Sequence, residues 1–376
     1  MSGELVLLTG GTGFLGYTIL LDLLQHGYRV RVAARSDGKI AKVRAASSIV
    51  ALDPPAAQLM FVVVPDMAAP GAYDEAVQDV DYIIHAAAPL HADHASVASD
   101  GSDPQQQRSL EEAFITACVQ GNLGILKSAR DKGKSVRRIV MTSSTVAIAP
   151  VDFFSDAAIA SQMDGGEEVI RGPDTRIPAL APPYKSQLHA YCTAKTASLE
   201  AAENFVKDQA PLHFDLISIM PSLIFGKDEL ATGTDSTRML MYRLIPNDTV
   251  AISNGGDASS NPKPTDEIAA VGNSVLCTDV ARAHVVALKP EVKGNQSFVL
   301  NTDLKWEDTV PVAKAHFPKA FESGLFRPAG PEWTTVPLRW DTSKVRDILG
   351  IDLARYDDMV KEVVGEYLEM MGSRPE

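Results

Sequence analysis

Tyr191 and Lys195 stand four positions apart in a segment with helical periodicity. Side chains at this spacing share one face of a helix, so we expect the lysine ammonium to lie beside the tyrosine hydroxyl. A nearby ammonium favours the tyrosinate form, which makes such a tyrosine usable as an acid or a base near neutral pH. Ser144 follows a predicted strand and could donate a hydrogen bond to a substrate carbonyl. These three residues are the candidate catalytic group, although a Tyr-x-x-x-Lys pair taken alone could equally be an exposed surface pair.

A glycine-rich turn near the start of the chain could hold the phosphates of a dinucleotide. Gly10, Gly13 and Gly16 stand three positions apart, between an apolar strand and an amphipathic helix. Glycine permits a tight turn and lets backbone N–H groups approach a pyrophosphate, which the helix dipole also attracts. The alternative is a purely structural turn. The candidate cofactor contacts of this segment are Gly10, Thr12, Gly13, Phe14, Leu15 and Gly16.

The end of the second predicted strand distinguishes between the two nicotinamide cofactors. NAD-binding sheets usually place an acid there, about 20 residues past the glycines, to hold the ribose 2′-hydroxyl. Here Ala33 and Ala34 are followed by Arg35, and Lys39 could add a second positive charge. A guanidinium fits a 2′-phosphate. We therefore predict NADP(H), while the alternative for Arg35 is a solvated arginine at a strand end.

Two further strand ends supply candidate cofactor contacts. Asp66 and Met67 follow the third predicted strand, and Asp66 could accept a hydrogen bond from an adenine amino group or simply begin a turn. Ala86 and Ala87 follow the fourth strand, and their small side chains leave room for a cofactor.

These residues require elements that bring strand ends together. Strand and helix signals alternate through about the first 220 residues, which predicts a parallel sheet covered by helices on both faces. The predicted strands are Glu4–Leu8, Tyr28–Ala33, Phe61–Val64, Tyr82–His85, Ile139–Met141 and Leu216–Ile219. The predicted helices include Tyr73–Val80, Glu111–Lys132 and Thr193–Lys207. The fold class is α/β, a Rossmann doubly wound sheet whose ligand lies at the C-terminal strand ends.

We expect a smaller C-terminal α/β lobe beside the Rossmann domain. The Rossmann domain would span residues 1–222, with 270–305 returning to it, and the substrate-binding lobe would comprise 223–269 and 306–376. Helices are predicted at Asp341–Leu349 and Tyr356–Met370, an irregular segment at Pro331–Arg339, and a polar mobile loop at Asp100–Arg108. Residues 151–190 form a long insertion between Ser144 and Tyr191, which predicts a loop over the active site.

Composition excludes several function classes. The net charge of −13 argues against a nucleic-acid partner, and no apolar run is long enough to span a membrane. Cys118, Cys192 and Cys277 form no spaced pair, and the first strand leaves no room for a signal peptide, so we expect a cytoplasmic protein. His91 and His94 lack a third ligand nearby, so no metal site is predicted.

The combined motifs resemble the extended short-chain dehydrogenase/reductases. The branch that the chain resembles contains dihydroflavonol reductase, cinnamoyl-CoA reductase and yeast aldehyde (methylglyoxal) reductase. The motifs that carry the resemblance are His26–Arg31 leading to Arg35, Val140–Thr145, Tyr191–Lys195, Met220–Gly226, Thr278–His284 and Asp341–Val345.

The resemblance implies roles for individual residues. Ser144 would polarise the carbonyl, Tyr191 would give the proton, and Lys195 would bind the nicotinamide ribose. Many members of the family carry an asparagine in the fourth helix that completes a catalytic tetrad. When this chain is aligned with the family's motif pattern, Thr116 stands at that position. The implied cofactor contacts near the nicotinamide are Ser143, Tyr191, Lys195, Pro221 and Ser222.

These patterns predict an NADPH-dependent reductase of a ketone or aldehyde, with a small or medium organic substrate, for example in secondary metabolism. One alternative is 3β-hydroxysteroid dehydrogenation, or nucleotide-sugar epimerisation or dehydration, on the same scaffold. Arg35 disfavours the nucleotide-sugar enzymes, which usually carry an acid there. The other alternative is a non-enzymatic NADP-binding sensor, although such proteins often lose the tyrosine or lysine. We expect a monomer or homodimer.

Overall fold

The computed structural model describes residues 3–88, 104–154, 171–230, 267–328 and 332–372. Its centre is a seven-stranded sheet with the order β3-β2-β1-β4-β5-β6-β10, in which all neighbouring strands are parallel. The strands are β1 (Leu5–Thr9), β2 (Arg29–Ala34), β3 (Leu59–Val63), β4 (Tyr82–His85), β5 (Arg138–Thr142), β6 (Asp215–Pro221) and β10 (Gln296–Leu300). The strand order reverses between β1 and β4, where open parallel sheets bind their ligands. The predicted Rossmann fold is confirmed.

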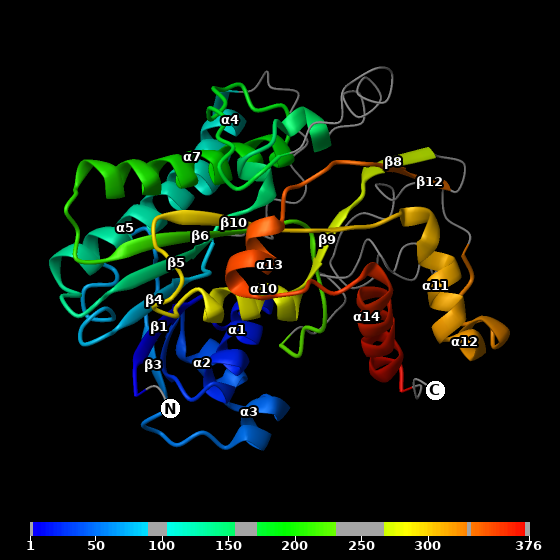
Figure 1. Ribbon diagram of the computed structural model, residues 1–376, viewed down its shortest axis with the longest axis horizontal. Coiled ribbons are helices and arrows are strands. Elements are labelled where there is room, and N and C mark those ends of the chain that lie inside the picture. Colours follow the sequence, from blue (N-terminus) through cyan, green and yellow to red (C-terminus); the bar gives the residue numbers. More distant parts are fainter. Residues whose placement is uncertain (1–2, 89–103, 155–170, 231–266, 329–331, 373–376) are drawn as a thin grey trace.

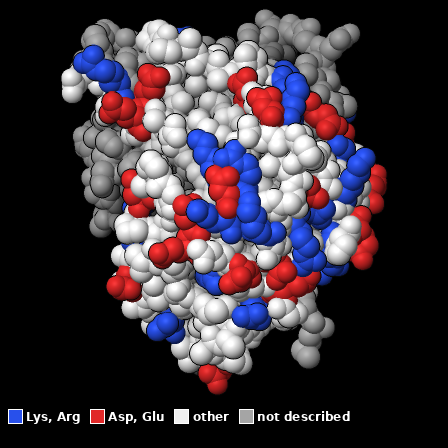
Figure 2. All heavy atoms as spheres, turned by 90° about the vertical axis from the view of Figure 1, so that its left-hand side faces the viewer, with Lys and Arg blue, Asp and Glu red and all other residues white. Residues whose placement is uncertain are grey.

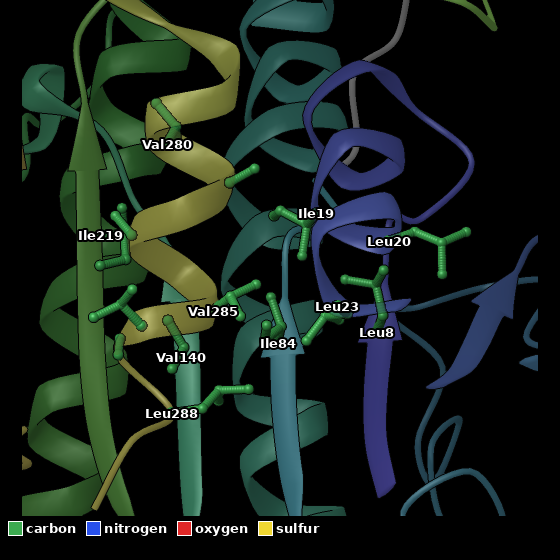
Figure 3. Close-up of a cluster of buried hydrophobic side chains, with 14 of the residues drawn as sticks. Leu8, Ile19, Leu20, Leu23, Ile84, Val140, Ile219, Val280, Val285 and Leu288 are labelled. Carbon is green, nitrogen blue, oxygen red and sulfur yellow. The ribbon is translucent and has the colours of Figure 1, made fainter. Parts of the chain in front are cut away.

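Long helices cover both faces of this sheet (Figure 1). On one face lie α1 (Phe14–Gln25) and α10 (Cys277–Val286), and on the other α5 (Ala117–Asp131) and α7 (Gln187–Asp208). Successive residues of a strand point to opposite faces. Leu8 and Ile84 therefore join the α1–α10 core, shown in Figure 3, whereas Leu7 and Ile83 join the core beneath α5 and α7. The inner strands β1 and β4 are buried on both faces, as expected for a parallel sheet covered by helices on both sides, whereas the edge strand β3 is only partly buried.

A second lobe follows β6 in the chain. It contains a sheet of β7 (Ile224–Phe225), β9 (Asn273–Leu276) and β11 (Thr302–Asp303), and the parallel pair β8 (Glu267–Val271) and β12 (Glu332–Val336). Its helices are α11 (Thr309–His316), α12 (Pro318–Glu322) and α14 (Tyr356–Met370). The core of this lobe surrounds Trp306, which is fully buried and donates its indole N–H to the Val271 carbonyl oxygen at 3.1 Å.

Three predicted elements differ from the structure. Residues 73–79 form turns instead of a helix, and Asp79 has a φ of +60°, outside the right-handed helical range. The buried apolar side chains of Tyr73 and Val77 have the spacing of a helix, which explains the prediction. The segment predicted as irregular contains β12. The predicted polar loop overlaps α4 (Pro104–Leu110), and its first part lies outside the described residues. Two short helices that follow β2 were not predicted from the sequence: α2 (Asp37–Arg44) and α3 (Ser47–Leu52).

Helix α13 (Ser343–Leu349) lies on the Rossmann sheet, although its sequence position suggested the second lobe (Figure 1). Its buried residues Val345 and Leu349 share one helix face and join the α1–α10 core, as does Ile351. The chain therefore returns to the large sheet twice, once through β10 and once through α13.

The charged surface is mixed on the face that Figure 2 shows. Basic and acidic side chains alternate there over the left-hand side of Figure 1. Among the surface ion pairs, Arg137 pairs with Glu4 at 2.6 Å and with Asp81 at 3.3 Å. Among the described helices, none combines the length and apolar character needed to cross a bilayer.

Candidate active site

The glycine turn joins β1 to α1 and leaves the first turn of that helix open. Gly10 has a φ of +75°, and a Cβ atom there would lie 2.7 Å from the Ala87 backbone nitrogen. A Cβ atom at Gly16 would lie 2.0 Å from the Gly10 carbonyl oxygen, so Gly16 lets helix and turn pack closely. Gly13 is exposed, with no such contact nearer than 3.5 Å, so its open side suits a ligand. No acid lies in the first turn of α1, which favours an anion. Partly buried around the turn are Thr12, Phe14 and Leu15.

Arg35 is exposed directly after β2 and has no hydrogen bond or ion pair within the described residues. Lys39 is also exposed, in the first turn of α2, so both side chains lie near the same strand end. An unpaired guanidinium at this position is available to a phosphate group.

Asp66 and Met67 have structural contacts. One carboxylate oxygen of Asp66 accepts a hydrogen bond from the Ala68 N–H at 2.9 Å. This contact is typical of a turn, which was one of the two interpretations of Asp66 from the sequence. Met67 packs against α5, where a Cβ atom at Gly121 would lie 2.4 Å from its terminal methyl carbon. Asp66 is exposed and keeps its second oxygen for a ligand, whereas Met67 fills a packing position.

A buried hydrogen-bond chain ties the strand end at Ala87 to β1. The Ala87 N–H donates to the Thr9 hydroxyl at 3.1 Å, and Thr9 lies 2.9 Å from His85 Nδ1. Because the hydroxyl already accepts from Ala87, its proton is available to Nδ1, which requires a neutral histidine. Burial lowers the pKa of His85 to about 4, and the Lys195 ammonium acts in the same direction. Neither Thr9 nor His85 was a candidate, because nothing in their spacing separates them from core residues.

A second buried histidine supports the other side of the site. His284 on α10 donates from Nδ1 to the Val280 carbonyl at 2.7 Å, so its Nε2 accepts from the Thr142 hydroxyl at 2.7 Å. Burial lowers the pKa of His284 to about 4. Thr142 ends β5, next to the serine pair, so this contact fixes the strand end that carries Ser144.

Stability should fall as the pH decreases from 6.5 to 4. In this window His85 and His284 take up protons in the unfolded chain but not in the folded protein. The unfolded state then binds more protons, and each histidine removes about 3 kcal/mol in total. Urea unfolding at several pH values would measure the slope. The variant His284→Gln, although less stable at pH 7, should show a shallower slope; an unchanged slope would contradict this assignment.

Tyr191 and Lys195 both lie on α7 and are both partly buried. The Lys195 ammonium nitrogen is 6.0 Å from the centre of the Tyr191 ring, so the pair shares one face as its spacing predicts. Tyr191 packs against a cluster that includes Phe114 and Tyr184. Packing against this cluster therefore holds the tyrosine ring in place, and the Lys195 ammonium lies near the same ring.

The serine pair lies where β5 and β6 end. Ser144 donates to the Pro221 carbonyl at 3.4 Å and accepts from the Val146 N–H at 3.3 Å, at the start of a short helical turn. The hydroxyl oxygens of Ser143 and Ser222 are buried and form no hydrogen bond with any described residue. One cavity is lined by Ala87, Ala88, Ser143 and Lys195, so these strand ends and α7 converge as predicted.

Thr116 does not reach this cavity. It is exposed and ends a π-helical segment, Glu111–Thr116, that leads into α5. A π-helical turn takes more residues than an α-helical turn and so rotates the following helix. Cys118 and Asn122, four positions apart on α5, line the cavity with Lys195 instead. The residue pattern of the fourth helix alone could not reveal this change of register.

The inserted segment is described at both ends. Arg171 donates its N–H to Arg339 at 3.0 Å and accepts from Asp341 at 2.7 Å, and the Arg176 guanidinium donates to Glu203 of α7 at 2.8 Å. Its end before Tyr191 is thus fixed to α7 and to the C-terminal chain. His91, His94 and residues 155–170 lie outside the described residues. Within the described ranges, no three His, Cys, Asp or Glu side chains form a metal-binding group.

A glycine turn at the switch point of a parallel sheet, facing a Tyr–Lys pair, defines a dinucleotide-binding Rossmann protein with a candidate proton donor. The chain belongs to the NAD dependent epimerase/dehydratase family, whose model matches residues 6–301. The predicted membership of the extended short-chain dehydrogenase/reductases is confirmed.

Similar proteins cover nearly the whole chain. Ketoreductase CTB6 of Cercospora beticola is 33% identical over 98% of this chain and 96% of its own length. The NAD-dependent epimerase/dehydratase FUM13 of Gibberella moniliformis is 30% identical over 98% of this chain and 96% of its own. Yeast methylglyoxal/isovaleraldehyde reductase Gre2, solved with NADPH, has a TM-score of 0.73 at 20% identity, covering 98% of this chain and 99% of that one.

Proposed function

We propose that this protein is an NADPH-dependent reductase that delivers a hydride to a ketone or aldehyde of a small or medium organic substrate. The observation that carries the proposal is the cavity that Lys195 lines together with Ser143 and Ala87, whose backbone packs against Gly10 of the glycine turn. Tyr191 lies beside Lys195 on α7, and Ser144 directly follows Ser143. The ketoreductase relative and the reductase of the same fold support the reaction class. A role in secondary metabolism is part of the proposal.

NADP(H) fits the residues at these strand ends. Gly13 is open, Arg35 is exposed without a partner among the described residues, and the buried hydroxyls of Ser143 and Ser222 offer hydrogen-bonding groups. The yeast reductase of the same fold was solved with NADPH, which supports this cofactor. When bound, NADPH supplies the hydride. We propose that it is held by Gly10, Thr12, Gly13, Phe14, Leu15, Gly16, Arg35, Lys39, Asp66, Ala86, Ala87, Ser143, Tyr191, Lys195, Pro221 and Ser222.

The chain's own residues would supply orientation and the proton. Ser144 would exchange its weak 3.4 Å contact with Pro221 for a hydrogen bond to the substrate carbonyl oxygen. Tyr191 would donate its phenolic proton to the same oxygen as negative charge develops there. Lys195 would stabilise the resulting tyrosinate and hold the nicotinamide ribose. Substrate choice would be determined by residues 151–190 and the second lobe, because the insertion connects Ser144 to Tyr191.

An epimerase or dehydratase, with a nucleotide sugar as its substrate, is the second candidate, because one relative is named an NAD-dependent epimerase/dehydratase. Such enzymes return the hydride to their substrate and show no net oxidation of added NADPH. The deciding experiment mixes the purified protein, NADPH and a panel of aliphatic and aromatic ketones and aldehydes, and follows absorbance at 340 nm. Net oxidation with a carbonyl compound supports the reductase. Conversion of a nucleotide sugar without net oxidation would support the alternative, and cofactor binding with neither reaction would support a sensor.

Arg35→Ala should raise KM for NADPH roughly 10-fold or more and change KM for NADH less than about two-fold. Only NADPH carries the 2′-phosphate that would lose a charge-assisted hydrogen bond. Arg44→Ala is the matched control, because Arg44 ends α2, the helix that follows Arg35, and its guanidinium carbon lies 5.0 Å from the centre of the Phe61 ring. Equal effects of Arg35→Ala on both cofactors would show that Arg35 does not contact the phosphate.

A further inference from the structure

Two neighbouring strands of the large sheet end side by side at the junction with the second lobe (Figure 1). β6 pairs with β10, with Pro221 opposite Leu300, and the next residues along the two strands are Ser222 and Asn301. The Ser222 N–H donates to the Leu300 carbonyl at 3.0 Å, so the pairing continues to this point. β11, which begins at Thr302, pairs with β9 of the second lobe. Asn301 therefore lies where the two lobes meet, a common location for ligand sites.

The side chain of Asn301 belongs to the face of the sheet that α7 covers. Successive residues of a strand point to opposite faces. On β10, Phe298 and Leu300 join the α1–α10 core, whereas Val299 packs in a cluster that α7 also joins. Asn301 follows Val299 by two positions, so the alternation places it on the α7 side, the face on which Tyr191 lies.

The strand order places Asn301 beyond Ser144 as seen from the glycine turn. The glycine turn follows β1, Ser144 follows β5 and Asn301 follows β10. In the sheet β5 lies two strands from β1, and β10 lies two strands further. Because neighbouring strands are about 4.8 Å apart, β10 is about 10 Å from β5, which is within the length of a medium-sized organic molecule. A cofactor that extends from the glycine turn to Lys195 leaves this side to the substrate.

The amide oxygen of Asn301 is buried and has no hydrogen-bond partner among the described residues. The residue as a whole is 6% exposed. Its amide nitrogen donates to a carboxylate oxygen of Asp303 at 2.9 Å. An ionised carboxylate only accepts, so this bond fixes the orientation of the amide and leaves its oxygen free to accept. Buried polar groups are almost always paired, so this oxygen requires a donor that the described chain does not supply.

We propose that Asn301 accepts a hydrogen bond from a hydroxyl group of the substrate and thereby selects carbonyl compounds that carry such a donor on the side away from the cofactor. Because the amide nitrogen is held by Asp303, an ether oxygen at this place would meet a second acceptor and be disfavoured. The inference rests on the proposed function, whose substrate it narrows from any small or medium carbonyl compound to hydroxylated ones.

Pairs of ketones that differ only in a hydroxyl or a methoxy group test this selection. The pairs place the group at increasing distance from the carbonyl: hydroxyacetone with methoxyacetone, and the meta and para isomers of hydroxyacetophenone with their methoxy counterparts. For at least one pair we expect kcat/KM to be about 10-fold or more higher for the hydroxyl compound, because only this compound supplies the missing donor. A ratio near one for every pair would overturn the proposal.

Asn301→Leu removes the acceptor and keeps the shape of the side chain. The ratio of the hydroxyl to the methoxy compound should fall to within about two-fold of one, mainly through a lower kcat/KM for the hydroxyl compound. Kd for NADPH should change only a few-fold, since the cofactor lies on the other side of Ser144. A variant that folds and keeps the wild-type ratio would show that Asn301 does not contact the substrate.

Asp303→Ala tests the orientation of the amide while Asn301 stays in place. Without the carboxylate the amide can rotate and offer its nitrogen, so the methoxy compound should gain and the ratio should fall. Asp303 is exposed, so this variant should fold even where Asn301→Leu does not, and it then decides. An unchanged ratio in Asp303→Ala would contradict an acceptor held in one orientation.

Asn295→Ala is the matched control. Asn295 precedes β10 at its other end, and its amide oxygen already accepts from the Leu216 N–H at 3.1 Å. Its loss should lower Tm and leave the hydroxyl-to-methoxy ratio unchanged, as any purely structural role would. The same change of ratio in Asn295→Ala and Asn301→Leu would indicate a general weakening of β10 and overturn the assignment.

Calorimetry separates this inference from the proposed function. With NADP⁺ in place of NADPH no reduction can occur, and Kd for each ketone is measured directly. Tighter binding of the hydroxyl compound that is lost in Asn301→Leu supports the contact, even in a protein that reduces none of these ketones; the proposed function alone would then fail. Net reduction of ketones without any such preference overturns the contact and leaves the proposed function standing.

Discussion

Replacing Tyr191 by phenylalanine is expected to lower kcat for carbonyl reduction by about 10²-fold or more, the usual scale for a positioned acid. The ring would still pack against Phe114 and Tyr184, so the fold and NADPH binding should be retained. The change removes only the proton that neutralises the developing alkoxide. Steady-state kinetics with NADPH and a titration of NADPH binding would separate the two effects.

Tyr82→Phe is the control for this substitution. The Tyr82 hydroxyl donates to Glu4 at 3.2 Å, and Tyr82 begins β4, at the N-terminal ends of the strands and so at the opposite end of the sheet from the active site. Its loss should leave kcat within about two-fold. Near-full activity of Tyr191→Phe would mean that another group delivers the proton, and the mechanism proposed for this site would then be wrong.

The glycines of the turn should respond very differently to alanine. Gly16→Ala would place Cβ 2.0 Å from the Gly10 carbonyl oxygen, so the backbone must move. We expect a loss of about 3 kcal/mol or more in unfolding free energy, together with loss of NADPH binding. Gly13→Ala meets nothing closer than 3.5 Å, and its φ of −113° suits alanine. It should keep its Tm within a few degrees but bind NADPH at least about 10-fold more weakly.

Thermal unfolding with and without NADPH measures both properties. The Tm of the wild-type protein should rise when NADPH is added. Gly13→Ala should have a similar Tm without NADPH, and adding NADPH should raise it only slightly. Full stabilisation of Gly13→Ala by NADPH would show that the phosphates do not approach this residue.

The sequence predicted those parts of the site that depend on local pattern. Apolar runs that end in glycine, alanine or serine revealed the strand ends, and helical spacing placed Tyr191 and Lys195 on one face. These features follow from the periods of strands and helices, which are readable without tertiary contacts. The placement of Ser144 and Pro221 in contact follows equally, because parallel strands end at the same edge.

The remainder depends on contacts between distant segments. Thr116 was the residue expected from the fourth helix, but it is exposed and ends a π-helical segment, and Cys118 and Asn122 line the cavity instead. A π-helical turn changes the register of the helix that follows, and residue propensities do not encode such a turn. His85 and Thr9 stand 76 positions apart, so only the sheet brings them together. The apolar face of α13 could have packed on either lobe, so the sequence alone did not locate this helix. In the folded chain α13 packs against the apolar residues of α10 and β10.

The late position of β10 also affects how the chain is made. Strand β6 ends at Pro221 and pairs on one side with β5, but its other partner begins only at Gln296. During synthesis at about 5–20 residues per second, β6 therefore presents an unpaired, apolar edge for on the order of ten seconds. The ribosome must therefore synthesise β7, β8 and β9 of the second lobe before the first domain can complete its sheet. A messenger truncated after residue 222 would yield a product with this edge permanently open, and such a product should aggregate rather than fold.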